Sequence, residues 1–230
     1  MCGGATVFHV LHSFNIKPTD RVGVIGVGGL GHLAIQFAAK MGCEVVVFSS
    51  TENKREEAMN LGAKQFVSIK GKGELNVGKQ IAHLIVTTSV PPDWDKFLPI
   101  MAPSGVIYPV TVSFDKLQLA YRVITRKELR VQGTLVAPRQ VHREMIEFAR
   151  LHGIKPIIEQ FPLMVEGITE AMDRLNEGKM RYRAVLVAQQ GRICKTRISP
   201  FRTCNITSCV CSCLHLLGSL FSLTFHYSVL

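Results

Sequence analysis

The chain has 230 residues, 47% of them hydrophobic, so it can bury the core of one or two domains, and a disordered protein is excluded. Its 27 basic and 17 acidic residues give a formal net charge of +10 at pH 7. Because the basic residues are scattered along the chain rather than gathered in a block, we expect an ordinary charged surface and no nucleic-acid partner.

Short apolar runs alternate with longer periodic segments over residues 1–151. The apolar runs predict six strands, at 21–25, 44–48, 65–69, 81–87, 105–110 and 129–133. The periodic segments predict helices within 1–12, from the glycine turn at 26–31 to Met41, from the segment 49–55 to Leu61, and at 94–101, 117–125 and 139–151. Strands and helices in this rhythm predict an α/β fold with a doubly wound parallel sheet, the Rossmann fold.

The rhythm changes after residue 151. An extended apolar segment at 156–163, an amphipathic helix at 165–175 and a strand at 182–188 follow without continuing the alternation. We therefore expect three parts: a dinucleotide-binding domain at 1–151, a separate substructure at 152–188, and an unrelated tail at 189–230.

A glycine turn joins the first predicted strand to the following helix. Gly26, Gly28 and Gly31 stand at G-x-G-x-x-G spacing. In that motif the first glycine permits a sharp turn, the second lets a pyrophosphate approach the backbone, and the third lets helix and strand pack closely. The positive end of the helix then faces the phosphates. This strand, turn and helix predict a dinucleotide site.

The end of the second predicted strand indicates which dinucleotide binds. An NAD site places a carboxylate there for the ribose 2′-hydroxyl, whereas an NADP site supplies donors to the 2′-phosphate. Ser49, Ser50 and Lys54 offer hydroxyls and a cation near a helix start, which favours NADP. Two alternatives stay open: Glu52 turns inward and serves NAD, or Lys54 and Arg55 are surface cations paired with Glu57 and other helix neighbours.

The chain resembles the zinc-type medium-chain alcohol dehydrogenases, in particular the NADP-dependent cinnamyl alcohol dehydrogenase branch, over residues 1–188. The resemblance rests on five segments: Met-Cys-Gly-Gly-Ala-Thr-Val-Phe at 1–8, Gly-Val-Ile-Gly-Val-Gly-Gly-Leu-Gly-His at 23–32, Lys-Arg-Glu-Glu-Ala at 54–58, Leu-Gly-Ala at 61–63 and Arg-Tyr-Arg-Ala-Val at 181–185. It implies a two-domain enzyme that interconverts primary alcohols and aldehydes by hydride transfer at a catalytic zinc. Its nucleotide-binding domains would pair into a homodimer.

The resemblance also implies roles for individual residues. Cys2 matches a zinc-ligating thiolate of the family. The pyrophosphate would lie on Gly26, Gly28, Gly29, Leu30 and Gly31, the 2′-phosphate on Ser49, Ser50 and Lys54, and the nicotinamide half near Thr87, Gly133 and Thr134.

The other zinc ligands of the family belong to a GroES-like catalytic domain that would precede residue 1. We therefore expect a truncated chain in which 152–188 is the return segment of that domain, and which binds NADP(H) weakly without turning over aldehydes. One alternative is an inactive nucleotide-binding or dimerisation module. Another is a zinc-free quinone reductase of the same superfamily, which Cys2 disfavours.

The cysteines and the C-terminal tail indicate the cellular location of the protein. Cys2 and Cys43 have no partner close in sequence, as is typical of a reduced, cytoplasmic protein. Residues 209–230 carry no Asp, Glu, Lys or Arg and nearly reach the length of a bilayer span, so a tail anchor is an alternative to a disordered tail. His215 and His226 weigh against the anchor, and we expect no membrane association.

Overall fold

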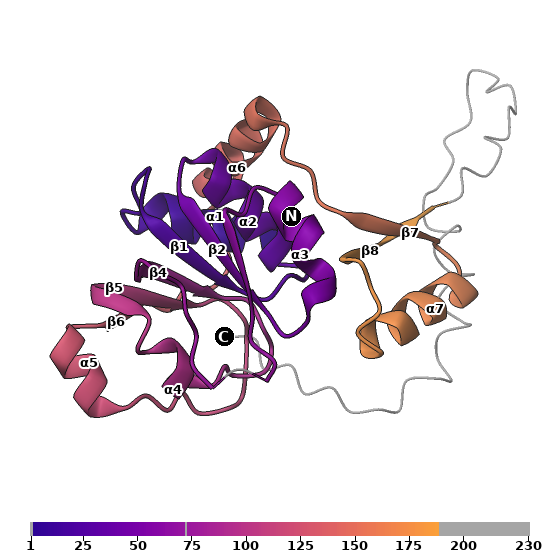
Figure 1. Ribbon diagram of the computed structural model, residues 1–230. Helices are drawn as coiled ribbons and strands as arrows, with labels where there is room; N and C mark the ends of the chain where they lie inside the picture. Colours follow the sequence, from indigo (N-terminus) through magenta and orange to yellow (C-terminus); the bar gives the residue numbers. More distant parts are fainter. Residues whose placement is uncertain (1, 72, 189–230) are drawn as a thin grey trace, which may run out of the picture. The chain divides into compact units, whose positions relative to one another are not determined.

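The computed structural model describes residues 2–71 and 73–188. Six strands form one sheet in the order β3-β2-β1-β4-β5-β6, and every neighbouring pair is parallel (Figure 1). They are β1 (Arg21–Ile25), β2 (Glu44–Ser49), β3 (Gln65–Ser68), β4 (Ile81–Val86), β5 (Met101–Pro109) and β6 (Arg130–Val131). This is the strand order of the dinucleotide-binding fold, and it confirms the predicted doubly wound α/β class.

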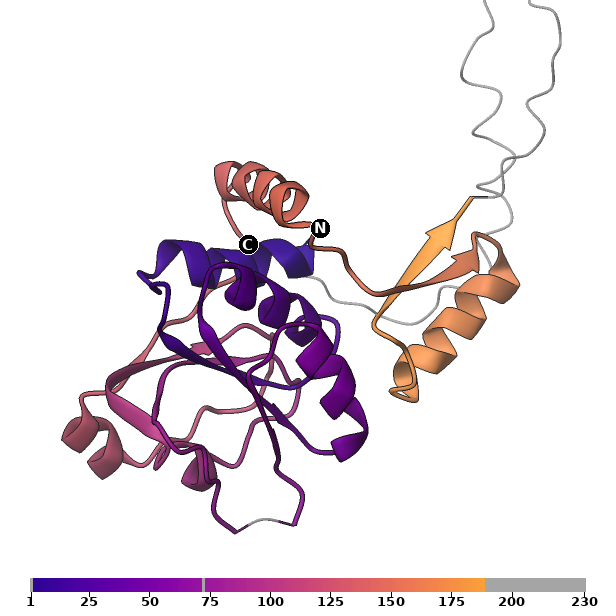
Figure 2. The ribbon, with the colours of Figure 1, turned by 45° about the horizontal axis from the view of Figure 1, so that its top comes forward.

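Helices cover both faces of this sheet. They are α1 (Cys2–Ser13), α2 (Gly31–Lys40), α3 (Arg55–Asn60) after a short 3-10 turn at Glu52–Lys54, α4 (Trp94–Phe97), α5 (Tyr121–Lys127) and α6 (Arg139–His152). In Figure 2, α1 and α6 lie together over one face, where α2 also packs. The second core takes side chains from α4, α5 and the loop before β4.

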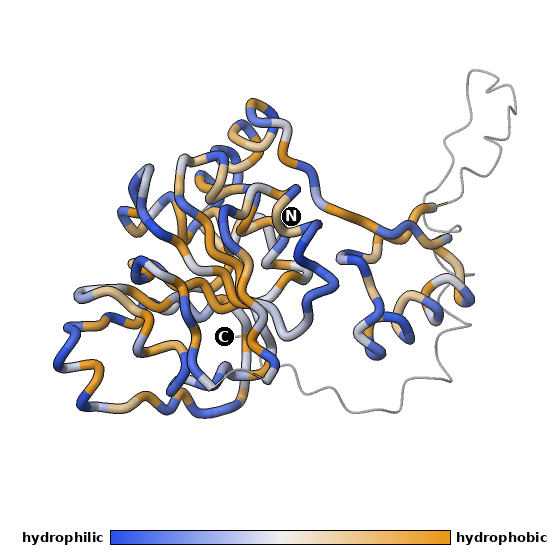
Figure 3. The backbone as a smooth tube through the Cα atoms, in the orientation of Figure 1, coloured by the Kyte–Doolittle hydropathy of each residue, from blue (hydrophilic) through white to orange (hydrophobic). Residues whose placement is uncertain are grey.

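The strand β2 shows why the sheet is buried on both faces. Val45 and Val47 belong to the first core, while Val46 and Phe48 belong to the second. Successive side chains of a strand point to opposite faces, so an unbroken apolar run suits a strand that is covered on both sides. Figure 3 shows the same hydrophobic character along the other central strands.

Four predicted elements of the main sheet and its helices differ from their expected bounds by more than one residue. The strand predicted at 129–133 is only Arg130–Val131. The helix predicted at 94–101 ends at Phe97, because Pro99 has no amide hydrogen to continue it. The strand predicted at 105–110 begins at Met101 and shifts register opposite Ile81 and His83. The helix predicted at 117–125 is wrong at both ends, since α5 runs from Tyr121 to Lys127.

Residues 153–188 contain a second, smaller sheet. β7 (Ile158–Pro162) and β8 (Arg183–Val187) pair in parallel, and α7 (Val165–Asn176) connects them. This substructure has a small core of its own, made of Phe161, Ala171 and Met180, and every residue of β8 is exposed.

The described residues contain no helix that could span a membrane, and the predicted tail lies beyond them. None of the helices within 2–71 and 73–188 combines the length and apolar character needed to cross a bilayer. The predictions for residues 189–230, including the tail anchor, lie outside the described residues.

Candidate dinucleotide-binding site

The three motif glycines of the turn occupy three different environments. Gly26 has a φ of +95°, in the left-handed region that favours glycine. A Cβ added at Gly28 would meet nothing within 4 Å, whereas one added at Gly31 would lie 1.9 Å from the Gly26 carbonyl oxygen. The turn therefore needs glycine at its first position for conformation and at its third for packing, while its second faces open space where a phosphate can approach.

The helix α2 begins directly after this turn. No side chain caps its N-terminus at Leu30. The first amide groups of a helix lack intrahelical partners and carry the positive end of the helix dipole, so an uncapped terminus can bind an anion. The predicted pyrophosphate residues Gly28, Gly29 and Leu30 all lie at this terminus.

Thr87 supports the turn from the neighbouring strand. It follows β4, which pairs with β1, and its hydroxyl donates to the Ile25 carbonyl at 2.7 Å. A Cβ added at Gly26 would lie 3.2 Å from the same hydroxyl oxygen. Thr87 thus lies where the strand order reverses, which is where open α/β sheets bind ligands. Its hydroxyl stabilises the backbone of the turn at this point.

The predicted 2′-phosphate residues lie at the end of β2 and just beyond it. Ser49 is buried and Ser50 is exposed. The Lys54 ammonium donates to the Val27 carbonyl at 2.9 Å and lies 5.3 Å from the centre of the Tyr182 ring. Burial lowers the pKa of Lys54, and this is only partly offset by the nearby Glu57 carboxylate. Lys54 therefore joins the end of β2 to the glycine turn.

The surface pairing considered for Lys54 and Arg55 is confirmed for Arg55, which pairs with a neighbour three residues away, but not for Lys54 or for Glu57 as the partner. Arg55 pairs with Glu52, its Nε lying 2.8 Å from Oε2. Glu57 instead accepts from Arg181 and from the Tyr182 hydroxyl. The acidic partner of Tyr182 is thus 125 positions away in sequence, which spacing along the chain could not indicate.

The residues predicted beside the nicotinamide after β6 are less enclosed. Gly133 is exposed and a Cβ there would meet nothing within 4 Å, while Thr134 is partly buried. The Gln132 amide just before them donates to the Ile107 carbonyl of β5 at 2.9 Å. Since β6 is parallel to the rest of the sheet, these residues follow the same edge of the sheet as the glycine turn.

Sequence reasoning assigned no role to Arg183, yet it lies at the turn. Its Nε donates to the Gly29 carbonyl at 3.3 Å, and a Cβ added at Gly3 would lie 2.0 Å from its guanidinium. The separation of 154 positions from Gly29 gave no signal of this contact.

His32 clamps the turn to the segment that leads into β7. The His32 side chain is fully buried, its Nε2 accepts from the Ile157 amide at 3.2 Å, and its Nδ1 lies 2.7 Å from the Gly28 carbonyl. The ring is neutral in this arrangement, with its proton on Nδ1 donated to Gly28. Burial lowers the pKa of His32, and Arg183 adds to this, while the bond to Gly28 opposes it.

Replacing His32 tests this clamp. We expect His32→Leu to lower the free energy of unfolding by about 1–2 kcal/mol at pH 7.5, because the Ile157 amide loses its acceptor. The folded-state pKa of His32 is lowered from 6.5, so the unfolded chain binds more protons below that pH and the native protein loses stability there. Urea unfolding at pH 7.5 and 5.5 should show a smaller difference between the two proteins at pH 5.5. An unchanged difference would contradict a neutral clamp.

Cys2 lies at a cavity that is lined in part by residues of α1, α2 and α6. The cavity has a volume of about 490 Å³ and a mostly apolar wall that includes Cys2, Phe37, Met145 and Arg183. Within the described parts of the chain no three His, Cys, Asp or Glu side chains gather in a way that could hold a metal ion. A catalytic zinc takes three protein ligands, so these residues do not fit the zinc that the resemblance implies.

The six-stranded parallel sheet and the glycine turn together define the Rossmann fold class. A family model described as zinc-binding dehydrogenase matches residues 29–150, and the chain belongs to this family. It is 36% identical over 186 residues to aldehyde reductase AdhA of Synechocystis sp., a match that covers 80% of this chain and 55% of the relative.

Solved structures agree with this assignment. Cinnamyl alcohol dehydrogenase SbCAD4 from Sorghum bicolor matches with a TM-score of 0.72 and 29% identity, over 80% of this chain and 53% of that one. CAD from Helicobacter pylori, complexed with NADP(H), matches with a TM-score of 0.68 and 27% identity, over 80% and 52%. The resemblance to the cinnamyl alcohol dehydrogenase-like branch is thereby confirmed for a partial segment. The chain spans about half the length of the curated relatives it matches.

Proposed function

We propose that the chain binds NADP(H) as the nucleotide-binding part of a zinc-type alcohol dehydrogenase or aldehyde reductase. The observation that carries this proposal is the geometry of the turn, in which Gly28 faces open space before an uncapped helix and Gly31 has no room for a side chain. A pyrophosphate fits where a larger residue at Gly28 would stand. The reaction that this supports is the interconversion of primary alcohols and aldehydes.

The chain's own residues would bind and orient the dinucleotide. Gly28, Gly29, Leu30 and Gly31 would present backbone amides to the pyrophosphate, and the Arg183 guanidinium at Gly29 would add a positive charge. Gly26 would border the pyrophosphate through the turn that it forms, because its own amide donates to the Phe48 carbonyl at 2.8 Å. Thr87, Gly133 and Thr134 follow strands β4 and β6, and would border the nicotinamide half. A bound nicotinamide exchanges a hydride with a carbonyl carbon, which is chemistry that the cofactor itself supplies.

The preference for NADP over NAD rests on Ser49, Ser50 and Lys54. Two hydroxyls and an ammonium at the end of β2 supply donors to a 2′-phosphate. Its bond to the Val27 carbonyl holds the Lys54 ammonium at the glycine turn, which supports a role in phosphate binding. The Helicobacter pylori relative is described as complexed with NADP(H), which is consistent with this preference.

The proposal extends to the domain boundaries, the cellular location, the role of Cys2 and the mode of dimerisation. We propose a dinucleotide-binding domain at 1–151, a return segment of the catalytic domain at 152–188, and cytoplasmic residence. Cys2 is a zinc ligand only in company with ligands from outside the described residues. A homodimer would use the outer edge of the sheet, where Val131 of β6 is exposed.

Titrating the purified chain with NADPH and with NADH tests the cofactor assignment. We expect tighter binding of NADPH, and we expect Lys54→Met to weaken NADPH binding by about tenfold while changing NADH binding much less, because a charge-assisted bond to the 2′-phosphate is lost. Equal affinity for the two dinucleotides would contradict NADP specificity. No measurable binding of either would contradict a dinucleotide site altogether.

An aldehyde reduction assay separates an enzyme from an inactive module. With zinc and NADPH supplied, we expect the chain alone to show no turnover while still binding the dinucleotide, since its described residues supply no three-ligand metal site. Ordinary turnover would show that the chain supplies a complete catalytic site.

A further inference from the structure

A carboxylate stands in the part of the fold where an NADP site should avoid one. Glu52 lies three residues beyond the end of β2, about 20 residues after the glycine turn, where NAD-binding proteins carry the acid that binds the ribose 2′-hydroxyl. An unpaired carboxylate there would repel a 2′-phosphate, which carries a charge of about −2. The proposed preference for NADP therefore requires that this charge be offset.

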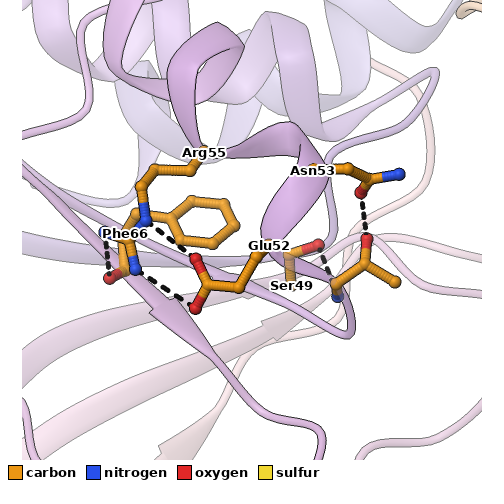
Figure 4. A network of polar contacts seen from close by, with 6 residues as sticks. Ser49, Glu52, Asn53, Arg55 and Phe66 are labelled. Carbon is orange, nitrogen blue, oxygen red and sulfur yellow. Dashed lines mark hydrogen bonds and ion pairs between the residues drawn. The ribbon is translucent and has the colours of Figure 1, made fainter.

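Arg55 holds the Glu52 carboxylate in a two-point contact. Its Nε lies 2.8 Å from Oε2 and its Nη2 lies 3.2 Å from Oε1, so both carboxylate oxygens accept from one guanidinium (Figure 4). Such a fork fixes the direction of the carboxylate as well as offsetting its charge. An ion pair joined by only one contact would fix the direction of the carboxylate and offset its charge less well, because its side chains would exchange partners with water.

The strand β3 fixes the Arg55 guanidinium in turn. Its central carbon lies 4.8 Å from the centre of the Phe66 ring, and its Nη1 donates to the Phe66 carbonyl at 3.4 Å. Figure 4 shows the chain of contacts from Phe66 through Arg55 to Glu52, beside Ser49. Stacking on a ring and bonding to a strand carbonyl favour this position of the guanidinium, although the Arg55 and Glu52 side chains are 50% and 56% exposed.

We propose that Arg55 determines cofactor preference indirectly, by neutralising Glu52 and holding it toward β3. This rests on the proposed function, because it concerns the same dinucleotide site. With Arg55 in place, the Glu52 carboxylate neither repels a 2′-phosphate nor accepts from a 2′-hydroxyl. Without Arg55, this compensating charge is lost, and the Glu52 carboxylate near the ribose opposes NADPH and favours NADH.

A double-mutant cycle tests the proposal by direct titration of the full chain with each dinucleotide. Arg55→Met keeps an apolar stem over Phe66. We expect it to weaken NADPH binding by about tenfold, because the Glu52 carboxylate repels the 2′-phosphate, and to tighten NADH binding, because the same carboxylate attracts the 2′-hydroxyl. Glu52→Gln should leave NADPH binding unchanged or tighter. The double variant should bind NADPH as Glu52→Gln does, because the charge that Arg55 offsets is no longer present.

Controls separate the possible failures. Arg150→Met breaks a similar pair with Glu147 on the exposed surface of α6, and should change neither affinity. If the double variant binds NADPH as weakly as Arg55→Met, Arg55 contacts the phosphate itself and the proposal is overturned. It is also overturned if Arg55→Met changes nothing. If the unmodified chain binds neither dinucleotide, it is the proposed function that fails.

Discussion

The variant Gly31→Ala is expected to destabilise the fold by about 3 kcal/mol or more, since overpacking of this kind forces the backbone to move. Its Cβ would lie 1.9 Å from the Gly26 carbonyl oxygen and 2.9 Å from the carbonyl carbon. Both atoms are backbone, so no side chain can rotate away. Urea unfolding measures the loss, and a stability within error of the unmodified chain would contradict the packing described for the turn.

Gly28→Ala is the matched control for that variant. Its Cβ would meet nothing within 4 Å, and its φ is not in the left-handed region, so we expect the stability to change by less than about 0.5 kcal/mol. The methyl group would nevertheless occupy the space through which a pyrophosphate approaches the backbone. A folded protein that has lost NADPH binding would therefore distinguish the role of Gly28 from that of Gly31.

Replacing Arg21 has the second large expected effect, and this effect is on stability alone. Its buried guanidinium pairs with Glu44 at the start of β2, bonds Gln65 at the start of β3, and donates to the Val77 carbonyl at 2.7 Å. We expect Arg21→Met to cost about 2–3 kcal/mol, less than a fully buried pair would because the Glu44 side chain is 38% exposed.

This network lies at the edge of the sheet opposite the glycine turn, since Arg21 begins the strand that the turn follows. NADPH affinity should therefore be unchanged while the variant is folded. The exposed pair of Lys179 with Glu177 provides the control, and Lys179→Met should be nearly neutral. Loss of NADPH binding by folded Arg21→Met would show that the two edges of the sheet are coupled.

Local pattern was enough to predict most of the central sheet. The apolar runs gave β1 at 21–25 with its observed bounds, because such a strand is buried on both faces and needs no distant partner to be recognised. The glycine spacing located the turn because the first glycine is needed for its conformation and the third for its packing. Elements near the surface were less predictable: α5 begins four residues later than its periodicity suggested.

Contacts between distant segments could not be predicted. Arg183 and Tyr182 approach the turn and Glu57 only after the chain has passed through α6, β7 and α7. The partner of Lys54 is a backbone carbonyl of Val27, which no residue pattern can specify. The sequence therefore predicts where the glycine turn lies, while the hydrogen-bond partners and the approach of Arg183 require the fold.

The most direct test of the account is to locate bound NADPH on the chain by nuclear magnetic resonance. In a titration of the isotope-labelled full chain, the backbone amides of Gly28, Gly29 and Leu30 should shift most, and those at Ser49 and Ser50 should shift with NADPH more than with NADH. Shifts confined to other parts of the chain, such as the cavity beside Cys2, would contradict the assignment of the glycine turn as the cofactor site.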